Sequence, residues 1–71
     1  MDLISAANYG DIRRVRELLD NGVDPNIKDD EGDSALIMAT IRSKIDVIRL
    51  LLDRGADPNI RDEDGETPLM R

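Results

Sequence analysis

Residues 18–27, Leu-Leu-Asp-Asn-Gly-Val-Asp-Pro-Asn-Ile, recur at 51–60 as Leu-Leu-Asp-Arg-Gly-Ala-Asp-Pro-Asn-Ile. The offset between the two segments is 33 residues (51 − 18 = 33), and Gly32 matches Gly65 at the same offset (65 − 32 = 33). Chance does not repeat a block of this length together with an isolated glycine. Because periods of roughly 20–50 residues are typical of stacked solenoids, the sequence predicts an array of repeated units.

Each unit is predicted to contain two short helices, because apolar residues recur at helical spacing. In the first helix of each unit these positions are Leu3, Ala6 and Ala7, then Leu36, Ala39 and Thr40. In the second helix they are Ile12, Val15, Leu18 and Leu19, then Ile45, Ile48, Leu51 and Leu52. Gly22 and Gly55 follow the second helices, where a left-handed residue commonly ends a helix, and Ser34 is placed as an N-cap. Helices this short depend on their neighbours for stability.

The sequence resembles the ankyrin-repeat family. Residues 62–69, Asp-Glu-Asp-Gly-Glu-Thr-Pro-Leu, are similar to the family's Asp-x-x-Gly-x-Thr-Pro-Leu opening, and residues 51–59 are similar to the end of its second helix. The resemblance covers the whole chain. It implies an all-α solenoid of antiparallel helix pairs, with a projecting β-turn or hairpin finger between consecutive pairs.

The units are expected at residues 1–28, 29–61 and 62–71, the last being the opening of a third repeat. Three departures from the family pattern fall in the second unit. Ser34-Ala35 replaces Thr-Pro, Ile37 replaces a His, and Ser43 replaces a common Gly, whereas the first unit keeps that glycine as Gly10.

Comparison of the second helices predicts a polar outer flank on the first unit. Arg14 and Glu17 correspond to Val47 and Leu50 (14 + 33 = 47; 17 + 33 = 50). A helix with a neighbour on each side needs apolar residues on both flanks, so the first unit is expected to be the N-terminal cap. No such cap follows the second unit. We therefore expect a piece of a longer array, or a chain completed by a partner, with a naturally short protein as the alternative.

The apolar flank of the second unit, including Ile45 and Leu52, also predicts self-association. Residues after this unit are too few to cover that flank fully, and exposed apolar patches on proteins recruit partners. The expected assembly is a two-fold dimer or a swap of the terminal segment between chains.

Composition excludes most catalytic chemistry. The chain has no Cys, His, Trp or Phe, which removes thiolate nucleophiles, imidazole bases and the common zinc ligands. Its serines have no His to activate them. The acidic turns do not match a calcium loop in any register, because such a loop needs Gly at its sixth position. The sequence therefore predicts no enzyme activity, no cofactor and no specific metal site.

The net charge of −6 comes from two short segments. Residues 28–33 and 61–66 each contain four acids and one base, so each carries −3 and the rest of the chain balances. A nucleic-acid surface needs clustered Lys and Arg, so no nucleic-acid partner is expected. The chain also lacks an apolar run of about 20 residues and a signal peptide, which favours a soluble cytoplasmic protein with no membrane partner.

The residues of the fingers fall into two groups. Asp29 and Gly32, like Asp62 and Gly65, match the repeated pattern and are attributed to turn geometry. The turn does not require acids at Asp30, Glu31, Asp33, Glu63, Asp64 and Glu66. These acids are either ordinary solvated surface or an acidic comb that attracts a basic partner.

Tyr9 is the single aromatic residue, and it lies at the end of the first helix, at the position matched by Arg42 (9 + 33 = 42). In the ankyrin family this helix end and the fingers line the concave binding face. Tyr is frequent among binding hot spots, with local packing as the alternative role. Asn8 and Ile41 are equivalent neighbours, and partial burial is the alternative for Ile41.

The resemblance thus predicts a protein-binding module, with a structural spacer or a regulatory segment as the alternatives. The predicted contact residues are Asn8, Tyr9, Lys28, Asp30, Glu31, Asp33, Ile41, Arg42, Arg61, Glu63, Asp64 and Glu66.

Overall fold

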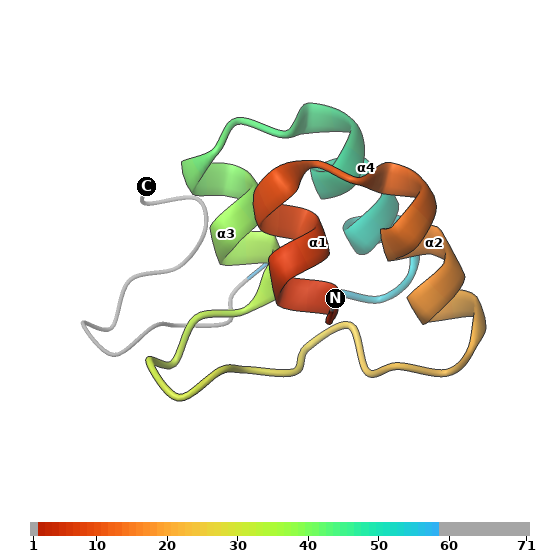
Figure 1. The fold of residues 1–71 in the computed structure, drawn as a ribbon, viewed down its shortest axis with the longest axis horizontal. Helices are drawn as coiled ribbons and strands as arrows, with labels where there is room; N and C mark the ends of the chain where they lie inside the picture. The colour runs from red at the N-terminus through yellow and green to blue at the C-terminus, as the bar shows by residue number, and fades with distance from the viewer. Residues whose placement is uncertain (1, 59–71) are drawn as a thin grey trace.

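The structure is a computed structural model that describes residues 2–58. Within that range it contains four α-helices: α1 (Leu3–Tyr9), α2 (Ile12–Asp20), α3 (Ala35–Ile41) and α4 (Ile45–Asp53). Short turns join α1 to α2 and α3 to α4 (Figure 1). The second helices begin and end at the predicted offset (45 − 12 = 33; 53 − 20 = 33). The predicted all-α repeat fold is confirmed.

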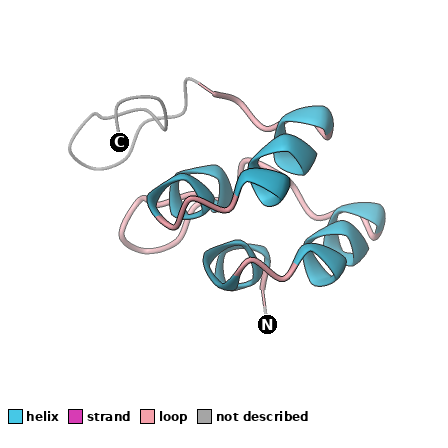
Figure 2. Ribbon diagram, turned by 90° about the horizontal axis from the view of Figure 1, so that it is seen from above, coloured by secondary structure: helices cyan, strands magenta, loops and turns pink. Residues whose placement is uncertain are grey.

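The helix pairs stack as two layers, seen from above in Figure 2. α1 packs closely against α3 as well as α2, and α4 contacts both α3 and α2. A continuous apolar core runs through both layers. Its buried members are Leu3, Ala6, Ala7, Val15, Leu19, Ala35, Leu36, Ala39, Val47, Leu51 and Ala56. Small buried alanines on α1 and α3 let these two helices approach closely.

Three of the four described helices begin at a side-chain cap. Asp2 accepts a hydrogen bond from the Ser5 backbone N–H at 2.8 Å, and Asp11 accepts one from Arg14 at 3.1 Å. Ser34 caps α3 through its buried Oγ, 3.2 Å from the Ile37 nitrogen, so serine serves here where the family has Thr. Each cap satisfies an otherwise unpaired N–H of the first turn.

The turns use left-handed residues at the predicted places. Gly22 and Gly55 follow α2 and α4 with φ of 92° and 93°, which confirms their role as helix terminators. The short turn inside each pair also needs a positive φ: Gly10 has 75°, and its counterpart Ser43 has 56°. A left-handed conformation is strained for serine, so the Ser43 departure has an energetic cost.

Side-chain contacts tie the two repeats together outside the core. Asn26 Oδ1 accepts a hydrogen bond from the Asp57 N–H at 2.7 Å, and its Nδ2 donates to the Gly55 carbonyl at 3.4 Å. The Arg54 guanidinium pairs with Asp20 at 2.6 Å. The repeated Asp-Pro-Asn segment therefore links successive turns as well as forming one, a role that the sequence pattern did not reveal.

Candidate protein-binding surface

The ends of α1 and α3 are joined by one polar contact. Arg42 Nε donates a hydrogen bond of 2.7 Å to Asn8 Oδ1. Both residues were predicted as contacts, and the structure brings them together across the repeat boundary. Asn8 is half-buried and Arg42 is exposed, so the pair lies at the surface.

Two apolar side chains lie at the same helix ends as this hydrogen bond. Tyr9 is 69% exposed and Ile41 is 44% exposed. Tyr9 directly follows Asn8, and Ile41 directly precedes Arg42. Most of the Tyr9 side chain is therefore accessible to a partner. The surface formed by Asn8, Tyr9, Ile41 and Arg42 is called the helix-end surface below.

The finger between α2 and α3 is a small hairpin closed by an antiparallel bridge between Lys28 and Ser34. It is the segment that turns below α1 before α3 begins, yellow-green in Figure 1. Asp29 organises it, since its Oδ1 accepts hydrogen bonds from the N–H groups of Glu31 and Asp33, both at 2.9 Å. Gly32, at φ 79°, donates to the Asp29 carbonyl at 3.1 Å. Asp29 and Gly32 thus have the structural role that was predicted.

The remaining acids of this finger face solvent to different degrees. Asp30 and Glu31 are exposed, and Asp33 is half-buried. Lys28 is exposed at the base of the hairpin. Among the described residues, no group of three or more acidic side chains is placed to hold a metal ion. The predicted contacts of the next finger, namely Arg61, Glu63, Asp64 and Glu66, lie outside the described residues.

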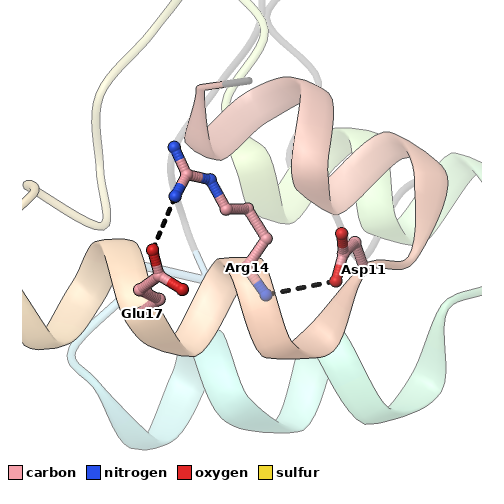
Figure 3. A network of polar contacts seen from close by, with 3 residues as sticks. All are labelled: Asp11, Arg14 and Glu17. Atoms are coloured by element: carbon pink, nitrogen blue, oxygen red, sulfur yellow. Dashed lines mark hydrogen bonds and ion pairs between the residues drawn. The ribbon is translucent and has the colours of Figure 1, made fainter.

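The outer flank of the first repeat is polar, as the helix comparison predicted. Arg14 Nη1 lies 2.7 Å from Glu17 Oε1, and the Arg14 backbone N–H donates to Asp11 (Figure 3). The counterparts on α4 are apolar: Val47 is buried and Leu50 is half-buried. This difference explains why α4 stacks on α2, whereas the far side of α2 is polar.

The flank of α4 that faces away from α2 also exposes apolar side chains. Ile45 is 61% exposed and Leu52 is 43% exposed. Their counterparts on α2 differ, because Ile12 is half-buried and Leu19 is buried under the second repeat.

Sequence reasoning did not predict an apolar hollow at the base of the first repeat. Its volume is about 320 Å³. It is lined mainly by Leu3, Ile4, Leu18, Val23 and Ile27, with Asp2, Lys28 and Asp29 completing the lining. It lies at the start of α1, the opposite end from Tyr9, and therefore competes with the helix-end surface as a place for a ligand.

Comparison with known proteins agrees with the architecture. The family model for ankyrin repeats, described as three copies, matches residues 3–71. No curated protein matches the chain. Repeats of this family generally mediate protein–protein interactions and are typically non-enzymatic. Within residues 2–58, no helix is long and apolar enough to cross a membrane. The chain belongs to the ankyrin-repeat family.

Proposed function

We propose that the chain is a non-enzymatic binding module that contacts another protein through the helix-end surface and the acidic finger. The observation that supports this most directly is the exposure of Tyr9, at 69%, beside the Arg42–Asn8 hydrogen bond. A rigid aromatic ring exposed on a short helix offers a large contact area at a small entropic cost.

The helix-end surface has the composition of a small hot spot. Tyr9 and Ile41 supply apolar area, and the planar guanidinium of Arg42 supplies several hydrogen-bond donors. The Arg42–Asn8 bond limits the freedom of both side chains before a partner arrives. Less ordering on binding means a smaller entropic cost, which favours affinity.

The finger supplies charge at the other end of α1 and α3, where Lys28 and Asp29 line the hollow at the start of α1, so a partner that contacts both regions has to extend along these two helices. Asp30 and Glu31 are exposed at its tip, so their charges act through solvent on the approach of a partner. A basic partner would be steered toward them, which increases the association rate more than the lifetime of the complex. The acids of the next unit, Glu63, Asp64 and Glu66, are proposed to extend this acidic comb, with Arg61 as a further contact.

The test is a titration of the ¹⁵N-labelled chain with a panel of peptides of equal length, some rich in Lys and Arg and some acidic. The proposal expects the basic peptides to shift the amide resonances of Asn8, Tyr9, Arg42 and the finger. Shifts at Ile4 and Ile27 instead would assign binding to the basal hollow. The absence of any shift would favour the structural spacer.

We also propose that the exposed flank of α4 mediates contact between two copies of the chain. The supporting observation is the difference in exposure between two equivalent residues, since Leu52 is 43% exposed and Leu19 is buried. The polar Arg14–Glu17 pair makes the opposite flank a poor partner, so a two-fold contact of α4 with α4 is expected. Light scattering over a concentration series should show a dimer that Leu52→Lys abolishes. A monomer at all concentrations would contradict this proposal.

A further inference from the structure

Asn21, which directly follows α2, is the one described asparagine whose side chain makes no hydrogen bond to the described residues. Asn8 accepts a hydrogen bond from Arg42, and both ends of the Asn26 carboxamide bond to the following repeat. Asn21 follows the last residue of α2, is exposed, and its carboxamide makes no hydrogen bond to residues 2–58. Its carbonyl carbon is therefore open to attack by a neighbouring nucleophile.

The residue after Asn21 is glycine, the residue type that least hinders the approach of its own backbone nitrogen to the Asn21 side chain. Gly22 lacks a Cβ, and no heavy atom lies within 4 Å of the position that a Cβ would take. The other two described asparagines precede bulky residues, Tyr9 and Ile27. Asn21–Gly22 thus combines an unrestrained carboxamide with an accessible backbone nitrogen, and neither Asn8 nor Asn26 has both features.

We propose that Asn21–Gly22 is a site of spontaneous deamidation. The Gly22 amide nitrogen, after losing its proton to hydroxide, attacks Cγ of Asn21. A new N–C bond closes a cyclic imide, the bond from Cγ to the side-chain nitrogen breaks, and ammonia leaves. Water then adds to one of the two imide carbonyls. Opening at Cγ yields aspartate, and opening at the main-chain carbonyl yields isoaspartate. No oxidant, reductant or enzyme is required.

The fold controls when this reaction occurs. The Gly22 N–H donates to the Leu19 carbonyl and the Val23 N–H to the Leu18 carbonyl, both at 3.1 Å. This pair of bonds ends α2 and holds Asn21 at ψ 5°. Ring closure needs the Gly22 nitrogen to rotate toward Cγ, which breaks both bonds. Deamidation therefore proceeds from states in which the end of α2 has opened, and its rate reports that local opening.

The products weaken the first repeat through charge and geometry. A carboxylate at position 21 lies at the negative end of the α2 dipole and beside Asp20, whose carboxylate already holds Arg54 of the next repeat at 2.6 Å. Isoaspartate also adds a methylene to the backbone inside the hydrogen-bonded turn. Both products should lower the melting temperature, and isoaspartate should lower it more.

The experiment is incubation of the purified chain in mildly alkaline buffer, followed by peptide mass mapping and enzymatic labelling of isoaspartate. Conversion should be confined to the peptide that contains Asn21, with Asn8 and Asn26 intact. It should accelerate several-fold in denaturant, because the closing hydrogen bonds are lost. Asn21→Gln should show no conversion, since glutamine would have to close a larger and slower ring. Equal conversion at Asn8 or Asn26, or an Asn21 that persists even in denaturant, would overturn the proposal.

Discussion

Arg42 and Asn8 form a hydrogen bond of 2.7 Å between two repeats, linking the turn after α3 to the last turn of α1. Because the bond is at the surface, its contribution to stability is small, about 0.5–1.5 kcal/mol. Its larger consequence is positional. Tyr9 and Ile41, its neighbours in sequence, are the exposed apolar residues of the same two helix ends. The bond therefore links the two helix ends that carry these side chains.

Two adjacent leucines of α4 provide a matched test of the fold. Leu51 is fully buried, whereas Leu52 is 43% exposed. Leu51→Ala should lower the free energy of unfolding by about 2–5 kcal/mol and abolish cooperative melting in so small a stack. Leu52→Ala should cost roughly 1 kcal/mol or less. Circular dichroism melts of both variants measure the difference, and equal losses would show that the assignment of Leu51 to the core is wrong.

The strained turn after α3 predicts a stabilising substitution. Ser43 has φ 56°, in the region that glycine adopts without cost. Ser43→Gly should raise the free energy of unfolding by about 1 kcal/mol, the usual cost of a left-handed non-glycine residue less the entropy that glycine adds to the unfolded chain.

The reciprocal change, Gly10→Ser, is its control. A Cβ at position 10 would lie 2.8 Å from Cδ of Lys44, so this variant combines strain with a clash that the lysine must move to relieve. Denaturant titration should rank the chains by free energy of unfolding, from highest to lowest, in the order Ser43→Gly, wild type, Gly10→Ser. The reverse order would contradict the backbone argument.

The sequence was sufficient to predict the fold because it contains the same unit twice. The 33-residue offset, the terminating glycines and the polar flank at Arg14 and Glu17 were all visible as residue types at fixed spacing. Each of these features is a residue type at a fixed position in the repeat, so comparing the two units along the sequence was enough to find it.

Contacts between repeats could not be predicted in the same way. The Asn26 bonds to Gly55 and Asp57 join residues about one full repeat apart, and nothing in Asp-Pro-Asn distinguishes a turn former from a link. The basal hollow depends on the packing of α1 against a loop, which no periodicity encodes. Asp2 and Asp11 are of a residue type that commonly caps helices, but among the described residues only Ser34 was predicted as a cap.

The cap of α1 predicts a pH dependence of stability. Hydrogen bonds from Ser5, first from its backbone N–H and then from its side chain, hold the pKa of Asp2 below its ordinary value of 3.8. Since the folded pKa is depressed, the charged cap stabilises the fold above the unfolded pKa, and this contribution is lost as the pH falls through the folded value.

Asp2→Asn isolates this effect, because asparagine also caps helices but does not titrate. At neutral pH the variant should be nearly as stable as the wild type, and as the pH falls below 3.8 the wild type should lose stability relative to the variant. Denaturant unfolding at a series of pH values measures the gap. A wild type that gains stability relative to the variant as the pH falls would be inconsistent with a depressed pKa at Asp2.

The acidic finger predicts a salt-dependent association rate. Replacing Asp30 and Glu31 with Asn and Gln removes two exposed charges, while Asp29, which organises the hairpin, is left in place. Association with the basic peptide should become slower, and the difference from wild type should shrink as ionic strength increases past ~0.15 M. Stopped-flow kinetics measures these association rates. Rates that respond neither to the substitutions nor to ionic strength would show that the acidic comb is ordinary solvated surface.

The affinity of the Tyr9→Ala variant is the most direct test of the central claim that the helix-end surface binds a partner. Tyr9 is 69% exposed, so the variant should fold normally, and its Kd for the tightest-binding peptide of the panel should increase about 5–30-fold, equivalent to ~1–2 kcal/mol. Arg13→Ala, an exposed change on α2, is the matched control and should leave the Kd unchanged. A Tyr9→Ala chain that is folded and binds with wild-type affinity would contradict the account.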